Sequence, residues 1–191
     1  QKLVFDGRAE TDGDFDITGG AGNDIITGGT GDDVLTGGDG ADTFVFQGGI
    51  DDLDTITDFT AGVGGDVFQF NFWKAAFILD GADSYQLGGA DEAQVLVGKG
   101  VYVVWGAVDG ELTSADFGGG AGQFSNPAAE TDFLFILGDS AGASKDVKIY
   151  HIDSRQDGNN GAIADGDIKL IGIFDLADET TLADVVADNI G

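Results

Sequence analysis

The sequence predicts an all-β protein in which a parallel β-roll is followed by a β-rich, sandwich-like C-terminal part with one or two short helices. Three observations predict this fold. Glycine-rich nine-residue repeats lie near the N-terminus, Asp outnumbers every other charged residue, and β-branched or aromatic runs bounded by Gly and Asp fill the rest of the chain. We expect two domains, at residues 1–60 and 61–191.

Three consecutive nine-residue units cover residues 19–45. Each has glycine at its first, second and fourth positions, Asp at its sixth and a large apolar residue at its eighth. Degenerate units flank them at 10–18 and 46–54; the first has Phe15 in place of the sixth-position Asp, and Asp12 and Asp14 are both candidates to substitute. Such strict register is not expected of a Gly/Asp-rich linker.

The spacing is read as six residues of turn followed by three of strand. Glycine is needed where the backbone takes positive φ and where carbonyl groups crowd inward around an ion. The eighth position points into the roll, where burial of each side chain contributes about 1.5–3 kcal/mol. The residues at this position are Ile17, Ile26, Leu35, Phe44 and Leu53.

Two units make one coil, so turns on the same side of the roll are expected 18 residues apart. Asp24 should then stack over Asp42 on one side, and Asp33 over Asp51 on the other. An ion between stacked turns would be held by Asp carboxylates and backbone carbonyls. This all-oxygen ligation suits Ca²⁺ better than Mg²⁺, which prefers to keep its waters.

The pattern G-G-x-G-x-D-x-U-x resembles that of the RTX (repeats-in-toxin) family, the calcium-dependent cargo of type I secretion in Gram-negative bacteria. Residues 41–46 leading to 54–59 resemble the family's exit from the roll, and 64–68 the segment that follows. The resemblance is specific over 19–70 and implies a secretion signal near the C-terminus. The calcium-ligand roles that it implies fall on Gly19, Gly22, Asp24, Gly28, Gly31, Asp33, Gly37, Gly40, Asp42 and Asp51, with Asp54 and Asp58 as caps of the last turn.

The charge is strongly negative: 35 acidic residues, 30 of them Asp, face eight basic ones, giving a net charge of −27. Two carboxylates about 4 Å apart repel by roughly 4 kcal/mol at an effective dielectric near 20, so bound cations are expected. The balance argues against nucleic acid and anionic membranes as partners. No apolar run approaches the roughly 18 residues of a membrane span, and a chain without Cys has no disulfide or Cys-ligated metal.

Residues 61–191 read as mostly β. An amphipathic helix is expected at 182–190 and a short helix at 71–79, around Trp73 and Phe77. The expected strands are 95–97, 101–105, 133–137, 147–152 and 168–174.

One segment in this region resembles a catalytic motif. Residues 138–142 match G-x-S-x-G, but the nucleophile elbow needs a helix after Ser140, and a strand is expected there, so a hairpin loop is the simpler interpretation. The only histidine, His151, lies in that strand, and a triad with Asp153 or Asp167 is a weak alternative.

A second segment resembles the start of an EF-hand. Residues 153–158 fail as one, because Arg155 occupies a ligand position and Ala164 stands twelfth. An irregular calcium loop using Asp157, Asp165 or Asp167 stays open as an alternative.

These features predict a non-enzymatic calcium-binding structural module of a secreted or cell-surface protein. It would fold on binding three or more Ca²⁺ ions after export by the type I secretion machinery, with self-association or a cell-surface partner in a surface layer or an adhesin. The alternative is the C-terminal carrier domain of an extracellular hydrolase, a protease or lipase, with its catalytic part upstream.

Overall fold

The computed structural model describes residues 1–46, 53–71, 83–87, 101–106, 112–117, 132–138, 145–153, 163–177 and 189–190. The named elements in these ranges are β-strands and two three-residue 3₁₀ turns, η1 (Ser114–Asp116) and η2 (Asp165–Asp167). The predicted all-β class with a parallel roll is confirmed. No helix in these ranges is long and apolar enough to cross a membrane.

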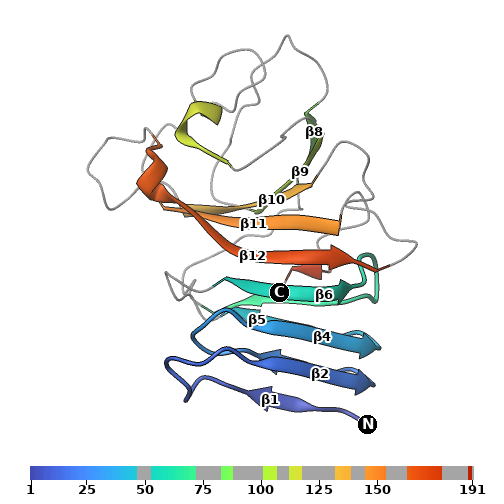
Figure 1. Cartoon of the computed structure of the whole chain (residues 1–191). Coiled ribbons are helices and arrows are strands. Elements are labelled where there is room, and N and C mark those ends of the chain that lie inside the picture. The colour runs from blue at the N-terminus through green and yellow to red at the C-terminus, as the bar shows by residue number, and fades with distance from the viewer. Residues whose placement is uncertain are drawn as a thin grey trace.

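The N-terminal part is a roll whose chain alternates between two parallel sheets (Figure 1). Within the regular repeats, each glycine-rich turn takes the chain from one sheet to the other. The first sheet contains β1 (Val4–Asp6), β3 (Ile25–Thr27), β5 (Thr43–Phe46) and β7 (Val67–Phe70). The roll strands of the second sheet are β2 (Asp16–Ala21), β4 (Val34–Asp39) and β6 (Asp54–Phe59).

The coils are not all of one length. Ile25 of β3 pairs with Thr43, at the expected 18-residue offset. Between β4 and β6, however, Leu35 pairs with Ile56, an offset of 21 residues. Ile56 is fully buried, whereas Leu53 is only partly buried and lies before the strand. The prediction that Leu53 fills the interior position is therefore wrong, because three extra residues in this coil bring Ile56 there instead.

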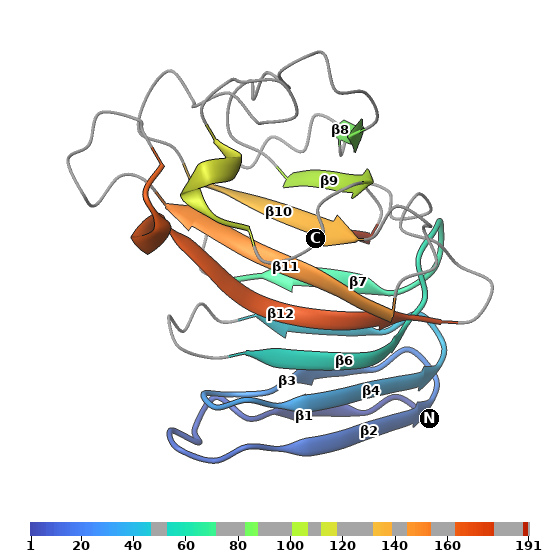
Figure 2. The same ribbon diagram turned by 45° about the horizontal axis from the view of Figure 1, so that its top comes forward.

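The remaining strands extend the second sheet beyond β6 (Figure 2). The strands predicted at 101–105, 133–137, 147–152 and 168–174 are confirmed. In order from β6 they are β12 (Ile168–Leu176), β11 (Lys145–Asp153), β10 (Asp132–Gly138), β9 (Val101–Gly106) and β8 (Asp83–Leu87). The strand predicted at 95–97 lies outside the described residues, as do 72–79 and 182–188 of the two predicted helices.

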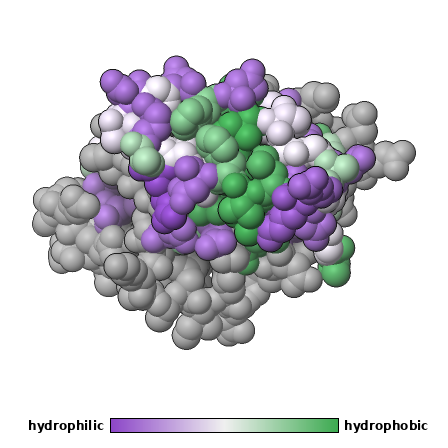
Figure 3. Space-filling model, turned by 90° about the horizontal axis from the view of Figure 1, so that it is seen from below, coloured by the Kyte–Doolittle hydropathy of each residue, from purple (hydrophilic) through white to green (hydrophobic). Residues whose placement is uncertain are grey.

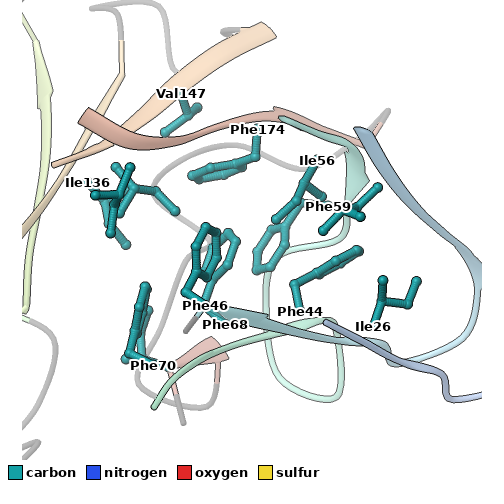
Figure 4. Close-up of a cluster of buried hydrophobic side chains, with 14 of the residues drawn as sticks. Ile26, Phe44, Phe46, Ile56, Phe59, Phe68, Phe70, Ile136, Val147 and Phe174 are labelled. Carbon is teal, nitrogen blue, oxygen red and sulfur yellow. The ribbon is translucent and has the colours of Figure 1, made fainter. Parts of the chain in front are cut away.

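One hydrophobic core joins the roll to these strands (Figure 4). Phe68 of β7 is fully buried, with its ring stacked on Phe59 at a centroid distance of 4.0 Å and tilted against Phe174 of β12 at 4.9 Å. β12 runs parallel to β6, with Phe174 opposite Ile56. Residues on both sides of position 60 therefore share one core. The domain boundary predicted between residues 60 and 61 stays a prediction.

The other end of the roll is closed by the first coil. Seen from below, apolar side chains gather there between hydrophilic ones (Figure 3). Leu3, Phe5 and Phe15 are partly buried and pack against the core, and the rings of Phe5 and Phe15 meet edge to face with centroids 5.3 Å apart. The aromatic pair thus covers the interior of the roll at this end.

Candidate calcium sites

A row of aspartates runs along each edge of the roll, with one residue in each coil after the first. On the first edge, the N–H groups of Leu3, Asp24 and Asp42 donate to Oδ1 of Asp24, Asp42 and Asp66, at 2.7, 2.8 and 2.7 Å. We call this series the first aspartate ladder. Each carboxylate is thus held by the backbone of the coil before it. The predicted stacking of Asp24 over Asp42 is confirmed.

The second aspartate ladder lies on the opposite edge. Phe15 N–H donates to Asp33 Oδ1 at 2.8 Å, and Asp33 N–H donates to Asp54 Oδ1 at 3.3 Å. The predicted stacking of Asp33 over Asp51 is therefore wrong, because the 21-residue offset between β4 and β6 puts Asp54 in that place. Asp51 itself lies outside the described residues.

The second carboxylate oxygen has a different environment. The two residues are at most 1% exposed, and Oδ2 of Asp24 and of Asp42 is buried without a hydrogen-bond partner. Leaving a buried, charged oxygen unmatched is costly. Burial and the charges of Asp24 and Asp58 raise the pKa of Asp42. A bound cation would compensate the buried negative charge of these oxygens.

The space beside each Oδ2 exists because the first residue of the repeat is glycine. A Cβ on Gly19 would lie 2.6 Å from the carbonyl oxygen of Gly37, in the next coil, and would overlap Oδ2 of Asp24. A carboxylate oxygen and a carbonyl oxygen from successive coils thus face one small space, which we call the cradle. The same overlap would occur between Gly28 and Asp33 and between Gly37 and Asp42.

The fourth-position glycines serve a separate purpose. Gly22, Gly31 and Gly40 all have positive φ, between 113° and 142°. A Cβ on Gly31 would lie 2.7 Å from the carbonyl oxygen of Gly13 in the coil before it. These positions thus allow the turns to stack closely. The donor set of the edges, carboxylate plus backbone carbonyl, is the one that Ca²⁺ prefers.

A Gly38→Ala substitution is expected to lower the free energy of unfolding by about 1–3 kcal/mol more than Gly64→Ala. Both glycines have positive φ, 99° and 79°, so both variants are strained. Only at Gly38 would the new Cβ overlap a neighbouring coil, at the carbonyl oxygen of Gly20, whereas nothing lies within 4 Å at Gly64. Urea denaturation at saturating calcium measures the difference, and equal losses would contradict close stacking of the turns.

The first coil lacks both ladder residues. Leu3 stands opposite Asp24 and Phe15 opposite Asp33, one residue before the pairs Val4–Ile25 and Asp16–Val34. Of the two candidates to replace the missing Asp, it is Asp14 that contacts the next coil, where its Oδ1 accepts the N–H of Asp32 at 3.0 Å.

Asp58 caps the turn at 37–38. Its two carboxylate oxygens accept the N–H groups of Gly37 and Gly38 at 2.9 and 2.8 Å. With Asp54 Oδ1 bound to Asp33 N–H, both predicted caps hold the turn of the coil before them.

Asp66 ends the first ladder, and the sequence prediction missed it. Its Oδ1 accepts the N–H of Asp42 and its Oδ2 that of Thr60, both at 2.7 Å, so both oxygens are bound by backbone. Burial raises its pKa to about 6. The signal was present, since Asp66-Val67-Phe68 repeats the Asp-x-apolar triplet of the nonapeptide.

In calcium-depleted buffer, the protein is expected to be more stable at pH 5 than at pH 7.5. The raised pKa values of Asp66, about 6, and of Asp42 mean that the folded state binds more protons than the unfolded one above pH 3.8. The stability from these protons is complete below pH 3.8 and is lost as pH rises through about 6. The β signal in far-UV circular dichroism at the two pH values measures it; Asp66→Asn should reduce the difference, and a signal at pH 7.5 as large as that at pH 5 would contradict it.

Two candidates for the irregular calcium loop in the C-terminal part, Asp165 and Asp167, accept backbone hydrogen bonds. Hydrogen bonds from the side chain and the backbone of Ser114 lower the pKa of Asp165, whose Oδ1 accepts the N–H of Ser114 at 2.7 Å. Asp167 Oδ2 accepts the N–H of Ala164 at 2.9 Å. Asp157 and Ser140 lie outside the described residues. Nowhere in the described ranges do three His, Cys, Asp or Glu side chains cluster as a metal site.

His151 and the hairpin before it can be placed. β10 and β11 are antiparallel, with Leu137 opposite Lys148, as the hairpin interpretation of residues 138–142 requires. His151 lies within β11, paired with Leu134 and Lys169.

A family model for the RTX calcium-binding nonapeptide repeat, in four copies, matches residues 18–53. This range contains Asp24, Asp33 and Asp42, and it ends before Asp54, Asp58 and Asp66. No curated protein and no solved structure matches the chain. Residues 18–53 are therefore RTX calcium-binding nonapeptide repeats.

Proposed function

We propose that this chain is a non-enzymatic, calcium-binding structural module of a secreted protein, and that its roll folds on binding Ca²⁺. RTX repeats are typical of extracellular proteins exported by type I secretion, which supports the location and the export route. The observation that carries the proposal is the pair of buried Oδ2 atoms, of Asp24 and Asp42, without hydrogen-bond partners.

The chemistry is charge compensation. Bound Ca²⁺ supplies positive charge between carboxylates that otherwise repel, in a chain of net charge −27. The residues that would hold it are the ladder aspartates Asp24, Asp33 and Asp42 with the carbonyl groups of the glycine turns, so three or more ions are expected. The backbone bonds to each Oδ1 fix the carboxylates, which places Oδ2 of Asp24 beside its cradle and Oδ2 of Asp42 beside the space that Gly37 leaves open.

The proposed role is structural. The strand β11 after residues 138–142, where a nucleophile elbow would need a helix, supports a role without catalysis. The surface-layer and adhesin assignments have no support in the fold or in the comparisons, and they are not part of the proposal.

Removal of calcium is expected to unfold the roll. Far-UV circular dichroism of the full chain at neutral pH should lose its β signal on addition of EGTA and regain it when Ca²⁺ is restored, because the ladder carboxylates then repel without compensation. Isothermal titration should count three or more ions. Mg²⁺ at the same concentration is the control and should restore little. A spectrum unchanged by chelation, with no heat of Ca²⁺ binding, would overturn the proposal.

A further inference from the structure

A side chain far from the repeats is bound to the exit of the roll. Asn189 is fully buried, and its Oδ1 accepts the N–H of Gly62 at 3.0 Å. Its Nδ2 donates to the carbonyl oxygens of Gly62 and Asp66, at 3.0 and 2.7 Å. The next residue, Ile190, pairs with Phe68 of β7 and belongs to the core. In Figure 1 the C mark lies at the level of β6.

The turn that Asn189 holds, residues 60–66, also has hydrogen bonds within itself. Asp66 N–H donates to the carbonyl oxygen of Thr60 at 2.8 Å, and Gly65 N–H to that of Gly62 at 3.0 Å. Gly62 and Gly64 have positive φ in this turn. Glycine has more conformational freedom in the unfolded chain than other residues, so ordering this turn costs more entropy. A carboxamide that bonds both ends of this turn reduces that freedom in the folded state.

The same turn is hydrogen-bonded to Asp42, a candidate calcium ligand of the first ladder. Asp42 N–H donates to Asp66 Oδ1 at 2.7 Å, and Asp42 C=O accepts the N–H of Val67 at 2.8 Å. Asp42 in turn has a buried Oδ2 without a hydrogen-bond partner. An unbroken series of hydrogen bonds therefore runs from Asn189 through Asp66 to Asp42, across 147 residues of sequence (189 minus 42).

We infer that Asn189 is a positioning residue for calcium binding at Asp42, which it controls by fixing the turn at 60–66. This inference rests on the proposed function, because it assumes that Asp42 binds Ca²⁺. It predicts that one site of the first ladder depends on a residue 127 positions beyond the turn that it holds, whereas the second ladder, on the opposite edge, does not.

The test compares Asn189→Asp with wild type in the full chain. The substitution keeps an acceptor for Gly62 N–H but removes the donor to Gly62 and Asp66 and places a charged oxygen beside two carbonyl groups. We expect the calcium affinity of one site to fall about tenfold, measured by isothermal titration. Hydrogen exchange of the Asp42 amide, followed by NMR, should accelerate at least tenfold, whereas the Phe15 amide, bound to Asp33, should be unaffected.

A double-mutant cycle separates positioning from a general loss of stability. Asp42→Asn keeps the oxygen that accepts Asp24 N–H and removes the charge. Combined with Asn189→Asp, it should lower calcium binding no further than Asp42→Asn alone, whereas Asp33→Asn and Asn189→Asp should be additive. If Asn189→Asp prevents folding, Asn189→Gln, which keeps both groups on a longer side chain, replaces it in the cycle.

The outcomes are distinct from those that test the proposed function. A protein that binds no Ca²⁺ at all would overturn the proposed function and this inference together. If wild type binds Ca²⁺ and Asn189→Asp changes neither the affinity nor the exchange of the Asp42 amide, the inference alone is overturned. Equal acceleration at Asp42 and at Phe15 would also overturn it, since that pattern indicates global destabilisation.

Discussion

Phe68→Ala is expected to lower the free energy of unfolding of the calcium-loaded protein by about 3–5 kcal/mol, the cost of removing a buried aromatic ring and leaving a cavity. Phe68 is fully buried and its ring lies parallel to that of Phe59, with a centroid distance of 4.0 Å. It also contacts Phe46 of β5 and Phe174 of β12. The substitution therefore removes contacts with the roll and with the C-terminal strands together.

Guanidinium denaturation at saturating calcium, followed by both circular dichroism and tryptophan fluorescence, measures this loss. Val4→Ala is the control, because Val4 is 63% exposed and its truncation should change stability by less than about 0.5 kcal/mol. Since the core is continuous, the two probes should report one transition in wild type and variant alike. A loss below 1 kcal/mol, or a change in only one of two transitions, would show that the roll and the C-terminal strands are independent.

The triple variant Asp24→Asn, Asp33→Asn, Asp42→Asn is expected to lose nearly all stabilisation by calcium. Each site at ten times its dissociation constant contributes about 1.4 kcal/mol, so three sites contribute about 4 kcal/mol to the wild-type protein. Asparagine retains the oxygen that accepts the N–H groups of Leu3, Phe15 and Asp24, but it removes the charge at Oδ2. The variant should be at least as stable as wild type in chelator and respond to Ca²⁺ by less than about 1 kcal/mol.

A charge-matched variant is the control for this experiment. Asp12→Asn, Asp16→Asn, Asp39→Asn also removes three negative charges, but from exposed side chains of the roll that lie outside the two ladders. It should retain the full calcium response and differ from wild type only through weaker general repulsion. If both triple variants lose the response equally, Ca²⁺ acts by screening the net charge instead of binding at the ladders.

The repeat alone was enough to predict the roll, the interior residues of the regular coils and the stacking of Asp24 over Asp42. The prediction from the repeat failed in the coil where two sequence triplets fitted the pattern equally well. Asp51-Asp52-Leu53 and Asp54-Thr55-Ile56 both match the Asp-x-apolar triplet, three residues apart. Local pattern cannot choose between them; in the folded roll Ile56 pairs with Leu35 and Phe174 on its two sides, and that packing fixes the longer coil.

Long-range pairing was also beyond the sequence pattern. The run at 168–174 was recognisable as a strand, but nothing in it indicates that it lies parallel to β6, more than a hundred residues earlier. Asn189 is a similar case, because an isolated asparagine near the C-terminus has no local signature, and its role arises only from the backbone groups of Gly62 and Asp66. Such contacts depend on how the elements pack.

The 18-residue offset between β3 and β5, and between β2 and β4, has a consequence for how such a protein can change in length. Duplicating residues 19–36 would insert one whole coil, advance the stack by about 4.8 Å and add one aspartate to each edge without altering the inward-facing positions. Each increment would touch only its two neighbours, so the gain should be close to additive. Duplicating a single nine-residue unit would instead move the aspartates of every later coil to the opposite edge, so modules of this kind should grow or shrink in steps of one coil.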